Sequence, residues 1–401
     1  MNKILNCLRS FIMDFNEKKM SDINFKDENF KKLLLDLKIN SLAEVTELNC
    51  ERHSFSLTSI NEIKYFPNLE TLTINSYDLE ELDLGYNLKL KNITIEDSEH
   101  LTEIDFSKNK LLEVLILGNL FVEKLDLKTN INLKKIFLDG LNELEDLDLT
   151  NNINLQEVHL EHMRLDATLN EKNKSLKKIY CSYGPSCSWD ENGLPELEEL
   201  TLENSELDSV DVNCFPKLKK LDITWNQISE IDLSENVLLE ELFILDNAFS
   251  AINLEKNVNL KSLSLGGDHD RESNKYVSHT HLDLTNNTKL INLYISKSSL
   301  AGIDLSKNLS LEALYIDENP IKSIHLSDNI SINRLIMQNT MLESLDLSEN
   351  KKLEDVTLKN NKLRTIQFPS SMNIVHSSLS KDLLEEKTIN HLIQMGLVFE
   401  E

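Results

Sequence analysis

The sequence predicts a right-handed, β-rich solenoid with parallel strands on both sides of each coil and a helical cap at each end. Three observations lead to this fold class. A frame that begins with leucine returns about every 21 residues, each repeat contains two short alternations of apolar and polar residues, and an asparagine closes most repeats. Self-similarity at a fixed period is the signature of stacked repeats, in which each coil contacts only its neighbours.

The repeat frame covers most of the chain. The segment "LEALYIDENPIKSIHLSDNIS" begins at Leu311, and equivalent segments begin at Ile332 and Leu353. The step is 21 or 22 residues except between Leu260 and Leu290, where it is 30. The fourteen starts are Leu69, Leu90, Leu112, Leu133, Leu155, Leu176, Leu197, Leu218, Leu239, Leu260, Leu290, Leu311, Ile332 and Leu353.

Each repeat contains two strand-like segments. In the quoted segment the first is centred on Tyr315 and the second on His325, and apolar residues flank both. Alternation of this kind indicates a strand with one buried face. Because strands on both sides give a coil two sides of similar width, we expect little curvature. The pattern leaves open which half of the repeat forms the concave side.

An asparagine recurs in the turn after the second strand of eleven of the fourteen repeats. Asparagine tolerates unusual turn dihedrals, and its amide both donates and accepts hydrogen bonds. A stack of inward asparagines can satisfy turn backbone groups that no sheet ladder reaches, so we interpret these residues as structural. They are Asn87, Asn109, Asn130, Asn152, Asn173, Asn236, Asn257, Asn287, Asn308, Asn329 and Asn350.

The two ends of the array need caps, because an open end would expose apolar surface and unpaired strands. Residues 1–68 are predicted as a helical N-terminal segment, helical over 1–44, followed by an imperfect capping coil. Residues 69–373 form the array of fourteen repeats. Residues 374–401, with the amphipathic stretch "KDLLEEKTINHLIQMGLVFEE", are predicted as a C-terminal capping helix.

The repeat L-x-x-L-x-L-x-x-N-x-L-x-x-L-D-L-x-x-N-x-x resembles the short, 21-residue bacterial type of the leucine-rich repeat family. The stretches "INFKDENFKKLLLDL", "VTELNC" and "LTSINEIKYFPNLETL" are similar to caps of bacterial proteins of that kind. The resemblance covers about residues 22–373 and implies a function in protein recognition. One departure is that the first-half asparagine is present only at Asn226, Asn247, Asn319 and Asn361.

The outward side chains of the first strands, here called the first-strand face, vary along the array and include many aromatic residues. An aromatic column rimmed by charge is typical of a protein-binding patch. The alternative is that neighbouring rings only stack along the ladder and stabilise the sheet. We favour binding because the opposite face lacks aromatic residues. The candidate protein-binding residues are Ile116, Phe137, His159, Tyr180, Tyr183, Trp225, Phe243, Asp246, Tyr294, Tyr315, Asp317, Glu318 and Ile336.

The second-strand face, made of the outward side chains of the second strands, is uniform. Like charges at the spacing of neighbouring strands repel, so we expect a local compensation, such as each aspartate accepting hydrogen bonds in its "DLS" turn. A surface for cations or a basic partner is the alternative. The central residues of this face include Asp83, Asp105, Asp126, Asp148, Asp211, Asp232, Asp283, Asp304 and Asp346.

The composition narrows the class of partner. Lys and Arg number 42 against 68 Asp and Glu, which gives a net charge of -26. This charge disfavours nucleic acid and anionic membranes and permits a basic protein that is steered in electrostatically. Five cysteines, an odd and small number, argue against a disulfide framework and favour a reducing compartment. The sequence contains no run of 18 apolar residues, so no membrane span is predicted. No secretory cleavage site follows the N-terminal stretch.

No catalytic motif is present in the sequence. It contains no glycine-rich nucleotide-binding pattern, no zinc-protease pattern and no nucleophile elbow. His159 and Glu161 share a strand but lack a third partner. The chain is therefore predicted not to be an enzyme, with no catalytic residues and no cofactor.

Two segments interrupt the repeats. Residues 266–281 contain Asp268, His269, Asp270, His279 and His281, which could hold a metal, but a solvated loop is the favoured interpretation and no metal site is predicted. Residues 181–193 carry two cysteines that do not form a C-x-x-C pair, and no metal or redox role is expected for them.

These observations predict a cytoplasmic protein-interaction module, with a binder or immunity-like neutraliser of a basic protein as the favoured form. The alternatives are a host-directed adhesin or effector delivered by a non-classical route, and a structural scaffold. The sequence names neither the partner nor the oligomeric state.

Overall fold

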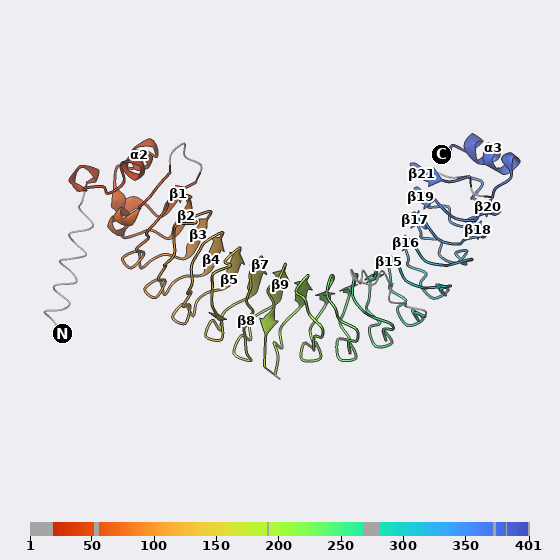
Figure 1. Ribbon diagram of the computed structural model, residues 1–401, viewed down its shortest axis with the longest axis horizontal. Coiled ribbons are helices and arrows are strands. Elements are labelled where there is room, and N and C mark those ends of the chain that lie inside the picture. Colours follow the sequence, from red (N-terminus) through yellow and green to blue (C-terminus); the bar gives the residue numbers. More distant parts are fainter. Residues whose placement is uncertain are drawn as a thin grey trace. The chain divides into compact units, whose positions relative to one another are not determined.

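The computed structural model describes residues 19–51, 56–190, 192–267, 281–371, 374–381 and 383–399. The chain forms two compact units, Met1–Leu197 and Glu198–Glu401. In both units the described coils are stacked, and the first strand of each repeat pairs in parallel with the first strand of the next (Figure 1). The solenoid predicted from the repeat period is confirmed. The division into residues 1–68, 69–373 and 374–401 stays a prediction.

The long sheet of the first unit is built only from first strands. Register places the same repeat position side by side in every pair, from Asn49 beside Thr73 to His159 beside Tyr180. Its strands are, in spatial order, β1 (Glu47–Cys50), β2 (Thr71–Asn75), β3 (Asn92–Glu96), β4 (Val114–Gly118), β5 (Lys135–Asp139), β7 (Glu157–Glu161) and β9 (Lys178–Ser182).

The second unit repeats this arrangement. Its register runs from Thr201 beside Asp222 to Thr357 beside Ser378. Its first strands are β11 (Glu199–Glu203), β12 (Lys220–Asp222), β13 (Glu241–Phe243), β14 (Ser262–Gly266), β15 (Asn292–Ser296), β16 (Ala313–Asp317), β17 (Arg334–Ile336), β19 (Asp355–Leu358) and β21 (His376–Leu379).

Strands also occur on the second side of the coils, but their ladders are short. In the described residues, the first unit has one ladder of β6 (Leu147–Asp148), β8 (Ala167–Thr168) and β10 (Cys187–Ser188), and the second has one of β18 (Ser344–Asp346) and β20 (Thr365–Gln367). Elsewhere on this side the chain is extended without a continuous ladder.

Each unit taken alone bends with its long strands on the inner side (Figure 1). The expectation of little curvature is therefore wrong within the units. Strand hydrogen bonds fix the spacing of the coils at about 4.8 Å on the first side. Few such bonds join the coils on the second side, so the coils can spread there.

The turn asparagines line the core as predicted. All eleven are at most 1% exposed. Each donates from Nδ2 to two backbone carbonyls of the preceding coil, at 2.7–3.2 Å. A buried carbonyl without a donor is costly, so this ladder replaces the sheet bonds that the turns lack.

A helix lies at the N-terminal end of the first unit. α2 (Glu28–Asp36) begins after Asp27, whose carboxylate accepts from the backbone N–H groups of Asn29 and Phe30 at 2.7 and 3.2 Å. The same carboxylate accepts from the backbone N–H and the hydroxyl of Thr58, at 2.7 and 3.0 Å, and so ties the helix to the first coil. Short 3-10 turns flank this region at η1 (Met20–Asp22), η2 (Leu42–Glu44) and η3 (Asn61–Tyr65). Residues 1–18 of the predicted helical segment lie outside the described residues.

The second unit ends in the helix α3 (Glu386–Gln394), which buries Leu392. The chain then returns to the sheet, where the N–H of Leu379 in β21 donates to the carbonyl of Val398 at 3.1 Å. This contact covers the last strand of the unit, as a cap must.

Candidate protein-binding face

The predicted candidates at the strand centres form straight columns. In the first unit Ile116, Phe137, His159 and Tyr180 are consecutive register partners on β4, β5, β7 and β9. In the second unit Phe243 is separated by one serine from Tyr294, Tyr315 and Ile336, which are again consecutive. The columns are the geometry that the repeat period implied.

The rings of the first unit are stacked. The centroids of Phe137 and His159 lie 4.3 Å apart at an interplanar angle of 27°, and those of His159 and Tyr180 lie 5.6 Å apart at 25°. Burial, opposed in part by Glu157 and reinforced by Lys135 and Lys178, lowers the pKa of His159. The ring is therefore neutral at pH 7, which leaves this column without charge.

After most of the first strands the backbone turns into the left-handed region, which non-glycine residues seldom adopt. The residue concerned comes directly after the strands that have five residues and two or three residues after the shorter strands β12, β13, β17 and β19. In most coils its N–H then donates to a carbonyl of the next coil, for example from His162 to Ser182 at 3.2 Å. These residues form a second column beside the first. They are Asp97, Asn119, Gly140, His162 and Tyr183 in the first unit, and Asn204, Trp225, Asp246, Gly267, Lys297, Glu318, Asn339 and Asn360 in the second.

Three bulky rings occupy this left-handed column, where a large side chain is strained. Tyr183 has φ 58° and is 45% exposed, and its ring stacks on His162 at 4.9 Å and an angle of 9°. His162 Nδ1 lies 2.9 Å from Asp139 Oδ1. Trp225 has φ 60° and is 46% exposed. Such residues gain nothing for the core, which points to a role at the surface.

In the second unit, the chain's own polar groups contact the candidate rings. Trp225 Nε1 donates to Asp246 Oδ2 at 2.8 Å, and Lys220 Nζ lies 5.6 Å from the centroid of Phe243. The rings of Tyr294 and Tyr315 are 5.8 Å apart. Arg334 donates to the Tyr315 hydroxyl at 3.2 Å, and its Nε lies 3.3 Å from a carboxylate oxygen of Asp355.

The acidic candidates of the second unit differ in their surroundings. Asp317 closes β16 and is half-buried; burial raises its pKa, although the N–H of Gln338 donates to its carboxylate at 3.1 Å. Glu318 occupies the left-handed position after it and is exposed. The two therefore place one shielded and one open carboxyl beside Tyr315.

A hollow of about 390 Å³ lies at the strand ends of the first unit. Its lining combines the candidates Ile116, Phe137 and His159 with residues outside the predicted set, namely Glu96, Asp97, Leu117, Gly118, Asn119, Leu138, Asp139 and Glu161. The signal that could have found them is position: each polar member is the last residue of a first strand or the one after it.

Among the described residues, the second-strand face carries no comparable aromatic column. All nine of its predicted aspartates accept a hydrogen bond from the backbone N–H two residues on, at 2.7–3.0 Å. The compensation expected for their mutual repulsion is therefore confirmed. These bonds lower the pKa of Asp105, Asp232 and Asp304, with the backbone N–H as the largest favourable cause in each.

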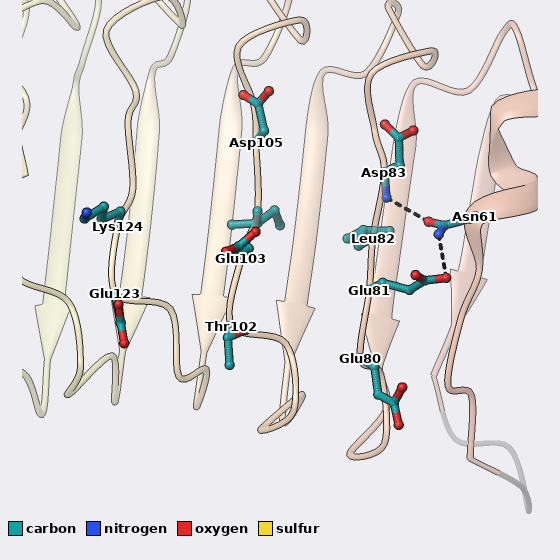
Figure 2. Close-up of a pocket in the computed structure, with 11 residues that line it drawn as sticks. Asn61, Glu80, Glu81, Leu82, Asp83, Thr102, Glu103, Asp105, Glu123 and Lys124 are labelled. Atoms are coloured by element: carbon teal, nitrogen blue, oxygen red, sulfur yellow. Dashed lines mark hydrogen bonds between the residues drawn. The ribbon is translucent and has the colours of Figure 1, made fainter.

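Figure 2 shows part of this face in the first unit, where Glu81 and Glu103 help to line a hollow of about 630 Å³. Asn61 organises one wall. Its Nδ2 donates to Glu81 Oε1 at 2.8 Å and its Oδ1 accepts from the N–H of Asp83 at 2.9 Å. The hollow is lined mainly by polar side chains and separates coils that no ladder joins.

Among the described residues, no group of three or more His, Cys, Asp or Glu side chains is arranged to hold a metal ion. Most of the 266–281 segment considered for metal lies outside the described residues, which resume at His281. None of the helices in the described ranges combines the length and apolar character that crossing a bilayer requires.

No protein-family model matches the sequence, and no curated protein matches it significantly. Solved structures do. The functional domain of InlJ from Listeria monocytogenes matches with a TM-score of 0.59 at 21% identity, over 86% of this chain and 76% of that chain. The leucine-rich repeat protein LIC12759 from Leptospira interrogans matches with a TM-score of 0.65 at 18% identity, over 92% and 98%.

A plant peptide hormone receptor, RGFR1 in complex with RGF2, matches with a TM-score of 0.56 at 15% identity, over 82% of this chain and 58% of that chain. At such identities the likeness concerns the fold alone. Together with the parallel strands and the repeat of about 21 residues, it shows that the chain has the leucine-rich repeat fold in its short form.

Proposed function

We propose that this protein is a non-catalytic interaction module that binds a basic protein through its first-strand face. The observation that carries the proposal is the stacked column of Phe137, His159 and Tyr180, which lies in register on the exposed side of a rigid sheet. Aromatic side chains on a rigid support are the residues most often found at binding hot spots. The fold supports the coarser function, because its structural relatives include receptors solved with protein or peptide ligands.

Charge supports the choice of a basic partner. In the first unit the ends of β3, β5 and β7 carry four carboxylates and no Lys or Arg, and we call these four the acidic edge: Glu96, Asp97, Asp139 and Glu161. The whole chain has a net charge of -26. A negative field of this kind speeds the approach of a positive partner and repels an acidic one.

The cytoplasmic, immunity-like form of the proposal is supported by cysteine chemistry. Cys50, Cys181, Cys187 and Cys214 are free thiols, and three of them are buried. Free buried cysteines suit a reducing compartment, where they act as small apolar residues.

The proposal can be tested by capture from native cytosol, with the secreted fraction processed in parallel. The bait is the full chain or the double variant Phe137→Ala with Tyr180→Ala. The control is Phe121→Ala, which removes an exposed ring three residues beyond the end of β4. A basic protein retained by the wild type and the control, but lost with the double variant, is the expected result.

Two outcomes would contradict the proposal. If the double variant retains every partner but melts at a much lower temperature, the rings act in ladder packing alone. If partners are captured only from the secreted fraction, the adhesin or effector alternative replaces the cytoplasmic one.

A further inference from the structure

We propose that the hollow beside Gly118 is a pocket for the guanidinium group of an arginine on the partner protein. This inference rests on the proposed function and assigns a specific contact to it. The hollow opens on the first-strand face, between the central column and the acidic edge.

The shape of the pocket follows from one missing side chain. Gly118 is the last residue of β4, and every neighbouring strand carries a longer residue there, Glu96 on one side and Asp139 on the other. A Cβ built on Gly118 would meet the Glu96 side chain at 3.4 Å, an ordinary contact, and no positive φ requires glycine here. The effect of Gly118 is therefore to leave space above the sheet, and the backbone conformation does not require a glycine at this position.

The walls of the pocket match a planar cation. Phe137 and His159 present aromatic surface, and a guanidinium favours the face of an aromatic ring. The carboxylate of Asp97 is held in place by the amides of Asn75 and Asn119, each at 2.8 Å. The pocket thus offers apolar contact on one side and fixed hydrogen-bond acceptors on the other. A planar guanidinium group fits this arrangement better than the strongly hydrated ammonium group of lysine does.

Two acidic-edge carboxylates have no partner of their own. Among the described residues, neither Glu96 nor Glu161 takes part in a side-chain hydrogen bond or an ion pair. Burial, followed by the charges of Asp97, Glu51 and Asp139, raises the pKa of Glu96. A bound cation would relieve this repulsion, so the pocket is electrostatically incomplete when empty.

The second unit contains the same chemistry already satisfied. There Lys220 lies over the ring of Phe243, and Arg334 contacts Tyr315. In the first unit the strand before Phe137 carries Val114 at the position of Lys220, and Lys135, on the same strand as Phe137, pairs with Glu157 at 3.0 Å. No cation of the described residues lies over Phe137, which leaves its ring for a cation from outside.

The test is to fill the pocket with an uncharged side chain, so that the net charge of the protein stays the same. The probes are fluorescein-labelled nona-arginine and nona-lysine peptides, measured by anisotropy at about 0.15 M salt. Gly118→Leu should weaken nona-arginine binding about tenfold, which corresponds to roughly 1.4 kcal/mol. The control, Asp83→Asn with Asp105→Asn, removes two negative charges from the second-strand face and should change binding less than about twofold, because distant exposed charges are screened.

An equal or larger effect of the control would overturn the pocket and leave diffuse attraction to an acidic protein. Nona-lysine binding as tightly as nona-arginine would overturn the guanidinium preference. Circular dichroism and melting check that Gly118→Leu folds, and Glu161→Gln provides a second variant if it does not. In the cytosolic capture, loss of the partner with Phe137→Ala but not with Gly118→Leu would reject the pocket and keep the proposed function.

An independent observation concerns the two cysteines for which no redox role was expected. Cys181 in β9 and Cys187 in β10 face each other across the core of one coil, with their sulfur atoms 3.5 Å apart. Both side chains are buried, and burial, followed by the neighbouring Cys187, raises the pKa of the Cys181 thiol. A disulfide needs an S–S distance of about 2.05 Å, so the two sulfur atoms would have to approach by about 1.5 Å.

The geometry points to Cys181 and Cys187 as a dithiol that oxidises to a disulfide when a small-molecule disulfide is present. When the coil opens locally, one thiolate attacks the oxidant and releases one of its thiols, and the second cysteine then displaces the other half. The protein loses two protons and two electrons, and the oxidant becomes two thiols. The crosslink would join the strand that carries Tyr180 to the opposite side of its own coil.

The reaction can be followed on the folded protein in oxidised glutathione, by intact mass and peptide mapping after acid quenching. We expect a loss of two hydrogen masses and a peptide crosslinked between positions 181 and 187 in the wild type and in Cys50→Ser. Cys187→Ser should show neither. Thiols that stay free until the chain is unfolded, or a bond to Cys50 or Cys214 instead, would refute the assignment.

Discussion

Asn130 offers the sharpest test of what holds neighbouring coils together. Its amide donates to the carbonyls of Phe106 and Asn109, at 3.0 and 2.9 Å, and the side chain is fully buried. Asn130→Ala removes both donors from carbonyls that water cannot reach. Each orphaned carbonyl costs about 1–3 kcal/mol.

Part of this cost is recovered, because Oδ1 of Asn130 has no partner among the described residues and leaves with the side chain. We therefore expect the free energy of unfolding to fall by about 2–4 kcal/mol. The matched control is Asn132→Ala in the same coil. Asn132 makes a similar bond to the carbonyl of Lys110, at 2.9 Å, but in an exposed position where water can replace it. Its loss should cost less than about 0.5 kcal/mol.

The measurement is urea unfolding followed by far-ultraviolet circular dichroism, with amide hydrogen exchange of the coil between residues 109 and 130. Exchange is needed because a repeat protein can lose one coil without unfolding as a whole. If Asn130→Ala destabilises no more than Asn132→Ala, the buried asparagines are not the bonds that hold the turns, and the structural interpretation fails.

Three further outcomes are expected. Asp27→Ala, which removes the helix cap and the bonds to Thr58, should lower the free energy of unfolding by about 2–3 kcal/mol, and protease sensitivity near α2 would show it; unchanged cleavage would contradict this. Tyr315→Ala should weaken partner binding by about 1–3 kcal/mol with little change in melting temperature, and calorimetry that finds the reverse would favour ladder packing. The turn aspartates, such as Asp105 and Asp304, have folded pKa values below the unfolded one, so their contribution to stability is complete above about pH 4 and is lost as pH falls through the folded values; a urea midpoint that already declines between pH 7 and 5 would need another titrating group.

The alternation of apolar and polar residues is enough to predict the central column. A strand shows every second side chain to the same face, and a fixed repeat length places equivalent residues in register. The repeat length therefore predicts that Phe137 lies beside His159 and that Tyr294 lies beside Tyr315, as the structure has them. The role of the asparagine ladder and the capping of the turn aspartates were predictable for the same reason, because both depend on contacts that repeat with the coil.

The pocket at Gly118 was not predictable in this way. A single glycine at one repeat position does not by itself indicate a pocket in the sequence. Whether it leaves a hollow depends on the lengths of the side chains on the two neighbouring strands. The left-handed position of Tyr183 and Trp225 also escaped the pattern, because nothing in an aromatic residue signals a positive φ. The close approach of Cys181 and Cys187 depends on how one irregular coil crosses its own core.

The sequence by itself determined the period, the inward and outward residues, the buried asparagines and the excess of acid, because each is a property of one repeat multiplied along the chain. The tertiary structure decided which side of the coil carries the continuous sheet. It also decided where carboxylates and rings converge around an empty position and which rings already have a cation from their own chain. These features depend on how the side chains of neighbouring coils differ. Such differences place atoms beside one another only when the coils are stacked.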